Sequence, residues 1–221
     1  MDWTALAVSL KLAAWTAAIL APVGIMLGRV LAWRAFRGRT LVEALLALPL
    51  VLPPTVLGYY LLVAMGANST LARASEALLG RPLAFTFNGL VVASLIVNLP
   101  FAIQPMQRAF EAISVDVRDA AKCCGLTPWS IFTRIELPLA WPGIASALVL
   151  TFAHTLGEFG VVLMVGGNIA AETRTVSIAI YDRAQAFDDR AAGTMAATLL
   201  LMSLIAIVAV YATTARRGLR R

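Results

Sequence analysis

Long apolar runs separated by short polar segments dominate this chain. A membrane-spanning helix needs roughly 20 consecutive, mostly apolar residues. Five runs reach that length, and they cover about residues 7–27, 41–64, 85–106, 139–165 and 191–212. The pattern therefore predicts an all-α membrane protein with five transmembrane helices in a single domain that spans residues 1–221.

Composition supports lipid exposure. Hydrophobic residues make up 60% of the chain and charged residues 14%, whereas soluble domains carry about a quarter charged residues. The formal net charge is +6, but the basic residues are scattered between apolar runs. We interpret them as contacts with lipid headgroups that set the topology, and we expect no nucleic-acid binding.

The basic residues also predict an orientation. With the N-terminus outside, five basic residues fall in outer segments and Lys11 lies near the outer end of the first run. Twelve fall in inner segments, namely Arg29, Arg34, Arg37, Arg39, Arg108, Arg118, Lys122, Arg134, Arg216, Arg217, Arg220 and Arg221. Because positive charge favours the cytoplasmic side, the N-terminus is expected outside and the C-terminus inside.

Two outer segments are too long to be simple turns. Residues 66–84 contain several polar positions and predict a short amphipathic helix with loops. Residues 166–190 begin polar and then become apolar, so they predict an element that is partly buried in the membrane.

The second apolar run contains the adjacent residues Pro53 and Pro54. Proline removes a backbone donor and clashes with the preceding turn, so this helix must kink or open. In lipid, a broken helix survives only where protein or a water-filled cavity surrounds it. Two interpretations remain open: a kink that serves packing, and a lining of a translocation pathway.

The fourth run contains His154, Gly157, Glu158 and Gly160. A carboxylate at this depth costs roughly 3 kcal/mol even on lenient insertion scales, so it must face protein or water, or be protonated. His154 lies four residues earlier on the same helical face and is a candidate partner for Glu158. The two glycines permit close backbone approach. Either a buried polar pair that fixes packing or a pathway residue fits this pattern.

No catalytic constellation accompanies these residues. No second carboxylate accompanies Glu158 in its run, and the chain has no GxxxxGK[ST] motif for ATP. The adjacent Cys123 and Cys124 have no His or further Cys nearby, which makes a poor metal site. We expect no cofactor, no metal and no enzymatic activity in this chain.

The loop between the third and fourth runs predicts a short helix over about residues 117–124. Asp116 is a candidate N-cap, and Asp119, three residues later, suggests a carboxylate variant of the capping box. Gly125 is a natural stop after the helix, and Pro128 prevents its continuation.

The same loop resembles the signature of ATP-binding-cassette import permeases: Glu-Ala-Ala, three residues, Gly, nine residues and Ile-x-Leu-Pro. Only Asp for Glu departs from that pattern. The resemblance implies a cytoplasmic coupling helix that docks in a groove of an ATPase subunit, and Ala120 and Ala121 are expected to form one smooth face there. It assigns coupling to Asp119, Ala120, Ala121, Gly125, Leu126, Ile135, Leu137 and Pro138.

Further stretches, at residues 9–12, 48–59, 156–160 and 167–181, resemble molybdate permease subunits. Two departures, His154 for arginine and Ala170-Ala171 for Pro-Gly, bear on substrate detail. This resemblance implies a homodimer in the bacterial inner membrane, two ATPase subunits and an extracytoplasmic substrate-binding protein. Candidate pathway residues are Pro53, Pro54, His154, Gly157, Glu158 and Gly160.

Three alternatives remain. Tungstate and sulfate or thiosulfate permeases share the fold and much of the loop motif. A proton-driven secondary transporter acting through Glu158 would need inverted repeats and usually more spans. An intramembrane enzyme would need a catalytic constellation that the sequence lacks.

Overall fold

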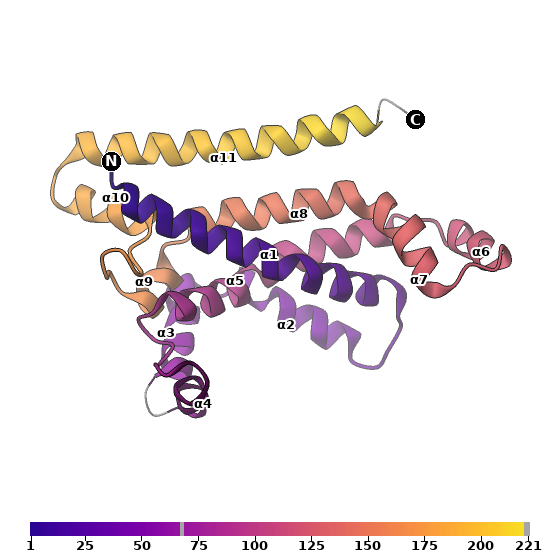
Figure 1. Cartoon of the computed structure of the whole chain (residues 1–221), viewed down its shortest axis with the longest axis horizontal. Helices are drawn as coiled ribbons and strands as arrows, with labels where there is room; N and C mark the ends of the chain where they lie inside the picture. The colour runs from indigo at the N-terminus through magenta and orange to yellow at the C-terminus, as the bar shows by residue number, and fades with distance from the viewer. Residues whose placement is uncertain (67–68, 219–221) are drawn as a thin grey trace.

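Three long helices form the centre of the molecule. The computed structural model describes residues 1–66 and 69–218. Helices α1 (Trp3–Trp33), α5 (Phe87–Glu111) and α8 (Leu137–Gly157) pack against one another pairwise, and Figure 1 shows them running side by side. Where they meet, buried apolar side chains such as Phe110 and Ile144 form a core cluster.

Close approach between α1 and α5 depends on small residues. A Cβ atom at Gly28 would lie 2.9 Å from the backbone nitrogen of Gln107, and one at Gly24 would lie 2.8 Å from the sulfur of Met106. At Gly28 the neighbouring atoms belong to the backbone, so a larger residue there would push the two helices apart. Small residues at helix contacts are typical of membrane proteins because they let the backbones pack closely.

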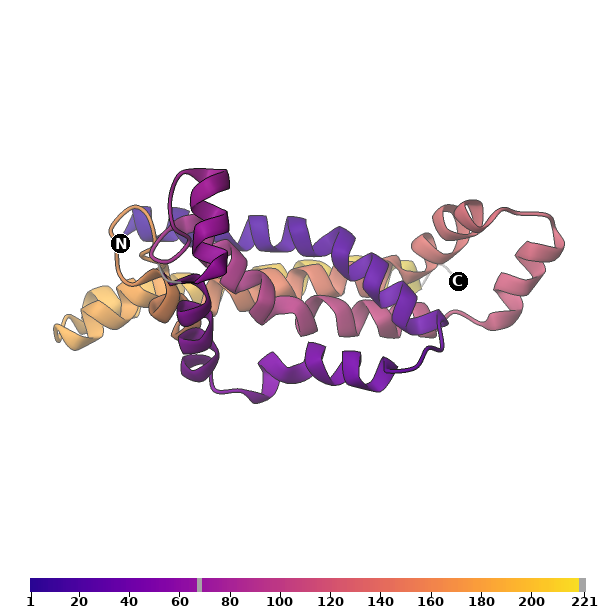
Figure 2. The same cartoon turned by 90° about the horizontal axis from the view of Figure 1, so that it is seen from below.

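The second apolar run is not one straight helix. Helix α2 (Arg39–Val51) and helix α3 (Pro54–Met65) are separated by two residues and bent by 111°. The kink or opening expected in the run 41–64 is thus a complete break between two helices. The cause is Pro53-Pro54: Pro54 lacks an amide donor and instead starts the next helix, a position that suits its fixed φ. Figure 2 shows α2 running alongside the bundle and α3 turning across it.

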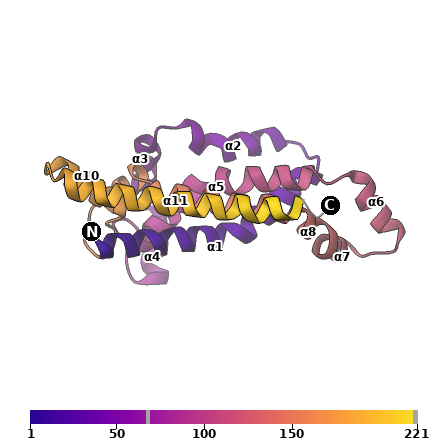
Figure 3. The ribbon, with the colours of Figure 1, turned by 90° about the horizontal axis from the view of Figure 1, so that it is seen from above.

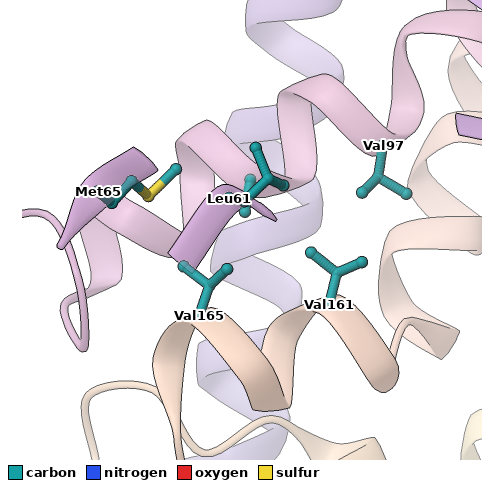
Figure 4. Close-up of a cluster of buried hydrophobic side chains, with 6 residues drawn as sticks. Leu61, Met65, Val97, Val161 and Val165 are labelled. Atoms are coloured by element: carbon teal, nitrogen blue, oxygen red, sulfur yellow. The ribbon is translucent and has the colours of Figure 1, made fainter. Parts of the chain in front are cut away.

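The fourth run is broken as well. Helix α8 ends at Gly157, Glu158 is extended, and a separate short helix α9 (Gly160–Gly166) follows. The continuous span expected over 139–165 is thus wrong beyond Gly157. Helix α9 packs on α3 and α5 through a cluster shown in Figure 4, which contains Leu61, Met65, Ala93, Val97, Val161 and Val165.

Short elements occupy both ends of the bundle. Helix α4 (Thr70–Leu79) is the short helix expected within 66–84. Helix α10 (Val176–Gln185) lies within the segment 166–190, and its Val176 N–H donates to Ser9 Oγ at 2.8 Å; its burial in the membrane stays a prediction. Both lie at the end of the molecule that carries the N-terminus (Figure 1). Helices α6 (Val115–Cys123) and α7 (Pro128–Ile131) lie at the opposite end.

Helix α11 (Asp189–Gly218) lies along one side of the bundle, against α8 and α10, as Figures 1 and 3 show. Leu200, Leu201 and Leu204 on this helix are exposed. In the described part of the chain, four helices are long and apolar enough to cross a membrane, or five if the bent pair α2–α3 counts as one span. The prediction of an all-α fold is confirmed, since residues 1–66 and 69–218 contain helices and loops but no strand.

Candidate functional site

Helix α6 begins differently from the sequence prediction. Its N-cap is Ser114, whose Oγ accepts a hydrogen bond from the Asp116 N–H at 3.2 Å. The predicted Asp116 cap is therefore wrong, because the hydroxyl two residues earlier takes that place and starts the helix at Val115. Asp119 does not reach back to the cap; it accepts a hydrogen bond from Lys122 Nζ at 2.7 Å. The Lys122 ammonium holds the pKa of the Asp119 carboxyl below its ordinary value.

The end of α6 is the glycine stop that the sequence predicts. Gly125 adopts a φ of +76°, a left-handed conformation that glycine reaches without strain. Its N–H donates to the Lys122 carbonyl at 2.9 Å, and the Leu126 N–H donates to the Ala121 carbonyl at 3.2 Å. These two bonds define a Schellman motif. The chain then turns back sharply into α7.

The outward surface of α6 differs from expectation in one respect. Ala121 is buried and Ala120 is exposed, so the two alanines do not share a face; successive residues of an α-helix point about 100° apart. The exposed surface carries Asp119 and Ala120 together with apolar Val117. Trp129 on the neighbouring helix α7 is 72% exposed. Exposed apolar side chains of this size favour contact with a protein partner.

A residue that the sequence prediction missed lies between Ile135 and Leu137. Glu136 ends a π-helical turn (Phe132–Glu136) that leads into α8, and its side chain is fully buried. It accepts hydrogen bonds from Arg118 Nε at 2.7 Å and from Arg29 Nε at 2.5 Å. The family signature leaves this position open. The available signal was a carboxylate at the start of an apolar run, where burial requires a partner.

The two helix breaks come together around a pocket of about 170 Å³. Its lining includes Pro54, His154 and Glu158, with apolar residues of α2, α3 and α5. Gly160 packs against Pro54, where a Cβ atom would lie 2.7 Å from the Pro54 Cβ. Three of the candidate pathway residues, Pro53, Gly157 and Gly160, are not among the residues that line this pocket, and Pro53 and Gly157 are exposed.

His154 and Glu158 are not paired, contrary to the candidate pairing from their spacing. His154 Nδ1 lies 3.1 Å from Asn98 Oδ1, and its ring stacks on Phe101 with centroids 4.0 Å apart. Glu158 is 8% exposed, and its Oε1 accepts a hydrogen bond from the Val161 N–H at 3.2 Å. Because α8 ends before Glu158, the helical spacing that would align the two side chains no longer applies.

A chain of polar side chains crosses the centre of the bundle next to this pocket. Thr16 Oγ1 of α1 donates to Ser94 Oγ of α5 at 3.0 Å, and Asn98 Nδ2 donates to the Ser94 carbonyl at 2.9 Å. Asn98 in turn contacts His154 of α8. The sequence prediction missed Thr16, Ser94 and Asn98. Only Asn98 could have indicated this chain from the sequence, because an amide side chain inside the third apolar run needs hydrogen-bond partners when it is buried.

Nothing in the described geometry favours metal chemistry. Residues 1–66 and 69–218 contain no group of three or more His, Cys, Asp or Glu side chains placed to hold a metal ion. Cys123 and Cys124 are free and exposed at the end of α6.

These features are those of a multi-pass membrane subunit with a projecting helical loop, and sequence comparison identifies the class. The chain belongs to the family described as the binding-protein-dependent transport system inner membrane component, which matches residues 21–221. The predicted membership of the import-permease family is therefore confirmed, and the family is one of transport subunits.

Relatives within the family are similar over most of their length. The chain is 44% identical over 212 residues to the molybdenum transport system permease protein ModB of Azotobacter vinelandii, which covers 96% of this chain and 94% of that protein. It is 37% identical over 180 residues to ModB of Escherichia coli K12, covering 81% and 79%. The sulfate transport system permease protein CysT of Escherichia coli K12 is 32% identical over 210 residues, covering 95% and 76%.

Solved structures of low sequence identity share the fold. A chain of a bacterial ABC transporter involved in the import of alginate has a TM-score of 0.78 at 18% identity, covering 96% of this chain and 78% of that one. A chain of the MetNI methionine ABC transporter has a TM-score of 0.61 at 19% identity, covering 97% and 91%. The prediction of an ATP-binding-cassette importer permease fold is confirmed.

Proposed function

We propose that this chain is the membrane-spanning permease subunit of an ATP-binding-cassette importer for molybdate. The observation that carries the proposal is the 44% identity over 96% of the chain to a molybdenum transport system permease protein. The α6–α7 loop supports it, because it projects from the bundle (Figure 1) and carries Asp119, Ala120 and Gly125, which belong to the segment that resembles the coupling signature.

The proposed complex contains two copies of this subunit, two ATPase subunits and an extracytoplasmic substrate-binding protein. Exposed Val117 and Trp129 at the α6–α7 loop suit a protein partner such as the ATPase. Helix α2 has no buried residue and exposes large apolar side chains, including Leu41, Leu45 and Val51. This surface is available to lipid and to the second copy.

We propose that the N-terminus faces outward and the C-terminal end of α11 faces the cytoplasm. The excess of basic residues in the expected inner segments supports this orientation. The arrangement of the helices agrees with it, because the α6–α7 loop and the end of α11 lie at one end of the bundle and α4 and α10 lie at the other (Figures 1 and 2).

We propose that the pocket at the two helix breaks belongs to the translocation pathway. Broken helices in a membrane protein persist where they line a cavity or are surrounded by protein. Molybdate is a dianion, yet the pocket is lined by apolar side chains, His154 and the carboxyl group of Glu158. Such a lining does not hold a dianion tightly. Selectivity therefore rests with the substrate-binding protein, and this subunit supplies a passage.

A second candidate substrate is sulfate, which the 32% identity to the sulfate permease protein favours. Thiosulfate and tungstate are further candidates, because both are tetrahedral dianions like molybdate. A proton-driven transporter is a weaker candidate. Such transporters are typically built from inverted repeats and usually have more spans than the four or five found among the described residues.

Uptake by the reconstituted complex tests the proposed function. The subunit is co-purified with its ATPase and placed in vesicles with its substrate-binding protein, and uptake of labelled molybdate, tungstate and sulfate is measured with and without ATP. We expect ATP-dependent uptake of molybdate in preference to sulfate. Uptake of sulfate alone would replace the proposed substrate, and uptake driven by a pH gradient without ATP would overturn the proposed class.

A further inference from the structure

Glu136 combines full burial with two cationic partners from different helices. A buried carboxylate is tolerated only where charge and hydrogen bonds are satisfied, since desolvation penalises an unpaired ion severely. Arg118 of α6 and Arg29 near the end of α1 both donate to it through Nε, one to each carboxylate oxygen. Glu136 itself precedes α8 directly. One side chain therefore joins three separate elements.

Aromatic rings hold the two arginines in place. The Arg118 guanidinium lies over the Trp33 ring at 3.9 Å from its centroid, and the Arg29 guanidinium lies over the Phe132 ring at 5.0 Å. Cation–π contacts of this kind are strongest where water is excluded. Each arginine is thus fixed both by the shared carboxylate and by a ring from another element.

Helix α6 has few other attachments to the bundle. Its one buried residue is Ala121. Among the described residues, the other side-chain hydrogen bonds of α6 remain within 114–122, namely those of Asp116 with Ser114 and of Lys122 with Asp119. The bond from Arg118 to Glu136 is the one that leaves the helix toward α8. A short helix between two loops moves together with the bundle only where hydrogen bonds or ion pairs connect the two.

We propose that Glu136 is a positioning residue that transmits movement of the coupling helix α6 to the inner ends of α1 and α8 together. The inference rests on the proposed function, in which the ATPase moves α6. Charge-assisted hydrogen bonds inside a low-dielectric site are short and directional, so a displacement of Arg118 displaces the carboxylate and, through it, Arg29. The π-helical turn before α8 is the segment that accommodates this displacement, since such turns often mark functional positions.

The test compares transport with ATP hydrolysis in the assembled complex. Arg118→Gln removes the charge of a partly exposed residue, whereas Glu136→Gln leaves the two arginines without a countercharge. For both variants we expect the ATPase subunit to co-purify and to hydrolyse ATP, while substrate transported per ATP falls by about fivefold or more. Arg118→Lys keeps the charge but not the planar geometry, so its ratio of substrate transported per ATP should lie between those of the wild type and Arg118→Gln.

The matched control is Arg108→Gln, which removes an exposed ion pair with Glu111 at the cytoplasmic end of α5. Its ratio of substrate transported per ATP should equal that of the wild type. An unchanged transport-to-ATP ratio in assembled Arg118→Gln would overturn the proposal. Loss of the ATPase subunit from both Arg118→Gln and Glu136→Gln would also overturn the proposal, because the contacts of Glu136 with the two arginines would then be needed for assembly of the complex and not for transmission of movement. Absence of uptake by the wild-type complex would instead count against the proposed function.

Discussion

The contact between Gly160 and Pro54 makes a quantitative prediction about the junction of α3 and α9. A Cβ atom added at Gly160 would lie 2.7 Å from Pro54 Cβ, with Pro54 and Thr55 backbone atoms at 3.6 and 3.7 Å. Carbon atoms in favourable contact are about 3.5–4.0 Å apart, so Gly160→Ala must separate the two helices by roughly 1 Å. Pro54 is a rigid ring at the start of α3 and cannot turn away. Overpacking of this kind costs about 1–3 kcal/mol.

Gly157 provides the matched control. It ends α8 on the other side of the break, and a Cβ atom there would meet no heavy atom within 4 Å. Gly157→Ala should therefore be neutral or stabilise the subunit by up to about 1 kcal/mol, because alanine favours helix over glycine. The two variants add the same methyl group three positions apart.

Thermal unfolding of the purified subunit in one detergent measures the difference. We expect Gly160→Ala to unfold several degrees below the wild type and Gly157→Ala at or slightly above it. Uptake should fall in Gly160→Ala, since the pocket lies between the displaced helices. Equal midpoints for the two alanine variants would refute the reasoning from the Gly160–Pro54 contact.

Three further predictions address the pathway, the coupling helix and the topology. Glu158→Gln retains an oxygen that accepts from the Val161 N–H, so stability should hold while uptake changes severalfold. Glu158→Ala should in addition lower the free energy of unfolding by about 1–3 kcal/mol. Normal uptake by Glu158→Gln would remove this residue from the pathway. The Gly125→Val subunit should still insert into the membrane but lose its ATPase subunit, because a β-branched residue in the left-handed conformation costs about 1–2 kcal/mol and disturbs the turn that ends α6. Gly125→Asn is the control and should be tolerated. Full substrate-stimulated ATP hydrolysis by the Gly125→Val complex would contradict the coupling role. A reporter after Arg221 should be active only in the cytoplasm and one after Gly66 only outside, and the reverse pattern would invert the proposed topology.

Local signals in the sequence were enough to predict several features of this protein. The apolar runs predict a bundle of membrane helices because lipid requires long uninterrupted apolar surface. Gly125 predicts the end of α6 because few other residues adopt its conformation, and the structure has that turn. Pro53-Pro54 predicts a break in the second run, which the structure places there. Each of these depends on neighbours along the chain or on the solvent.

Pairings between distant residues depended on the tertiary structure. His154 and Glu158 are four positions apart and would align on a continuous helix, yet the break after Gly157 separates their roles. His154 contacts Asn98, 56 residues earlier, and Glu136 pairs with Arg29, 107 residues earlier. Helical periodicity determines which side of one helix a residue occupies. Which partner a buried polar group meets follows from how separate helices pack, and that packing brings together residues the sequence leaves far apart.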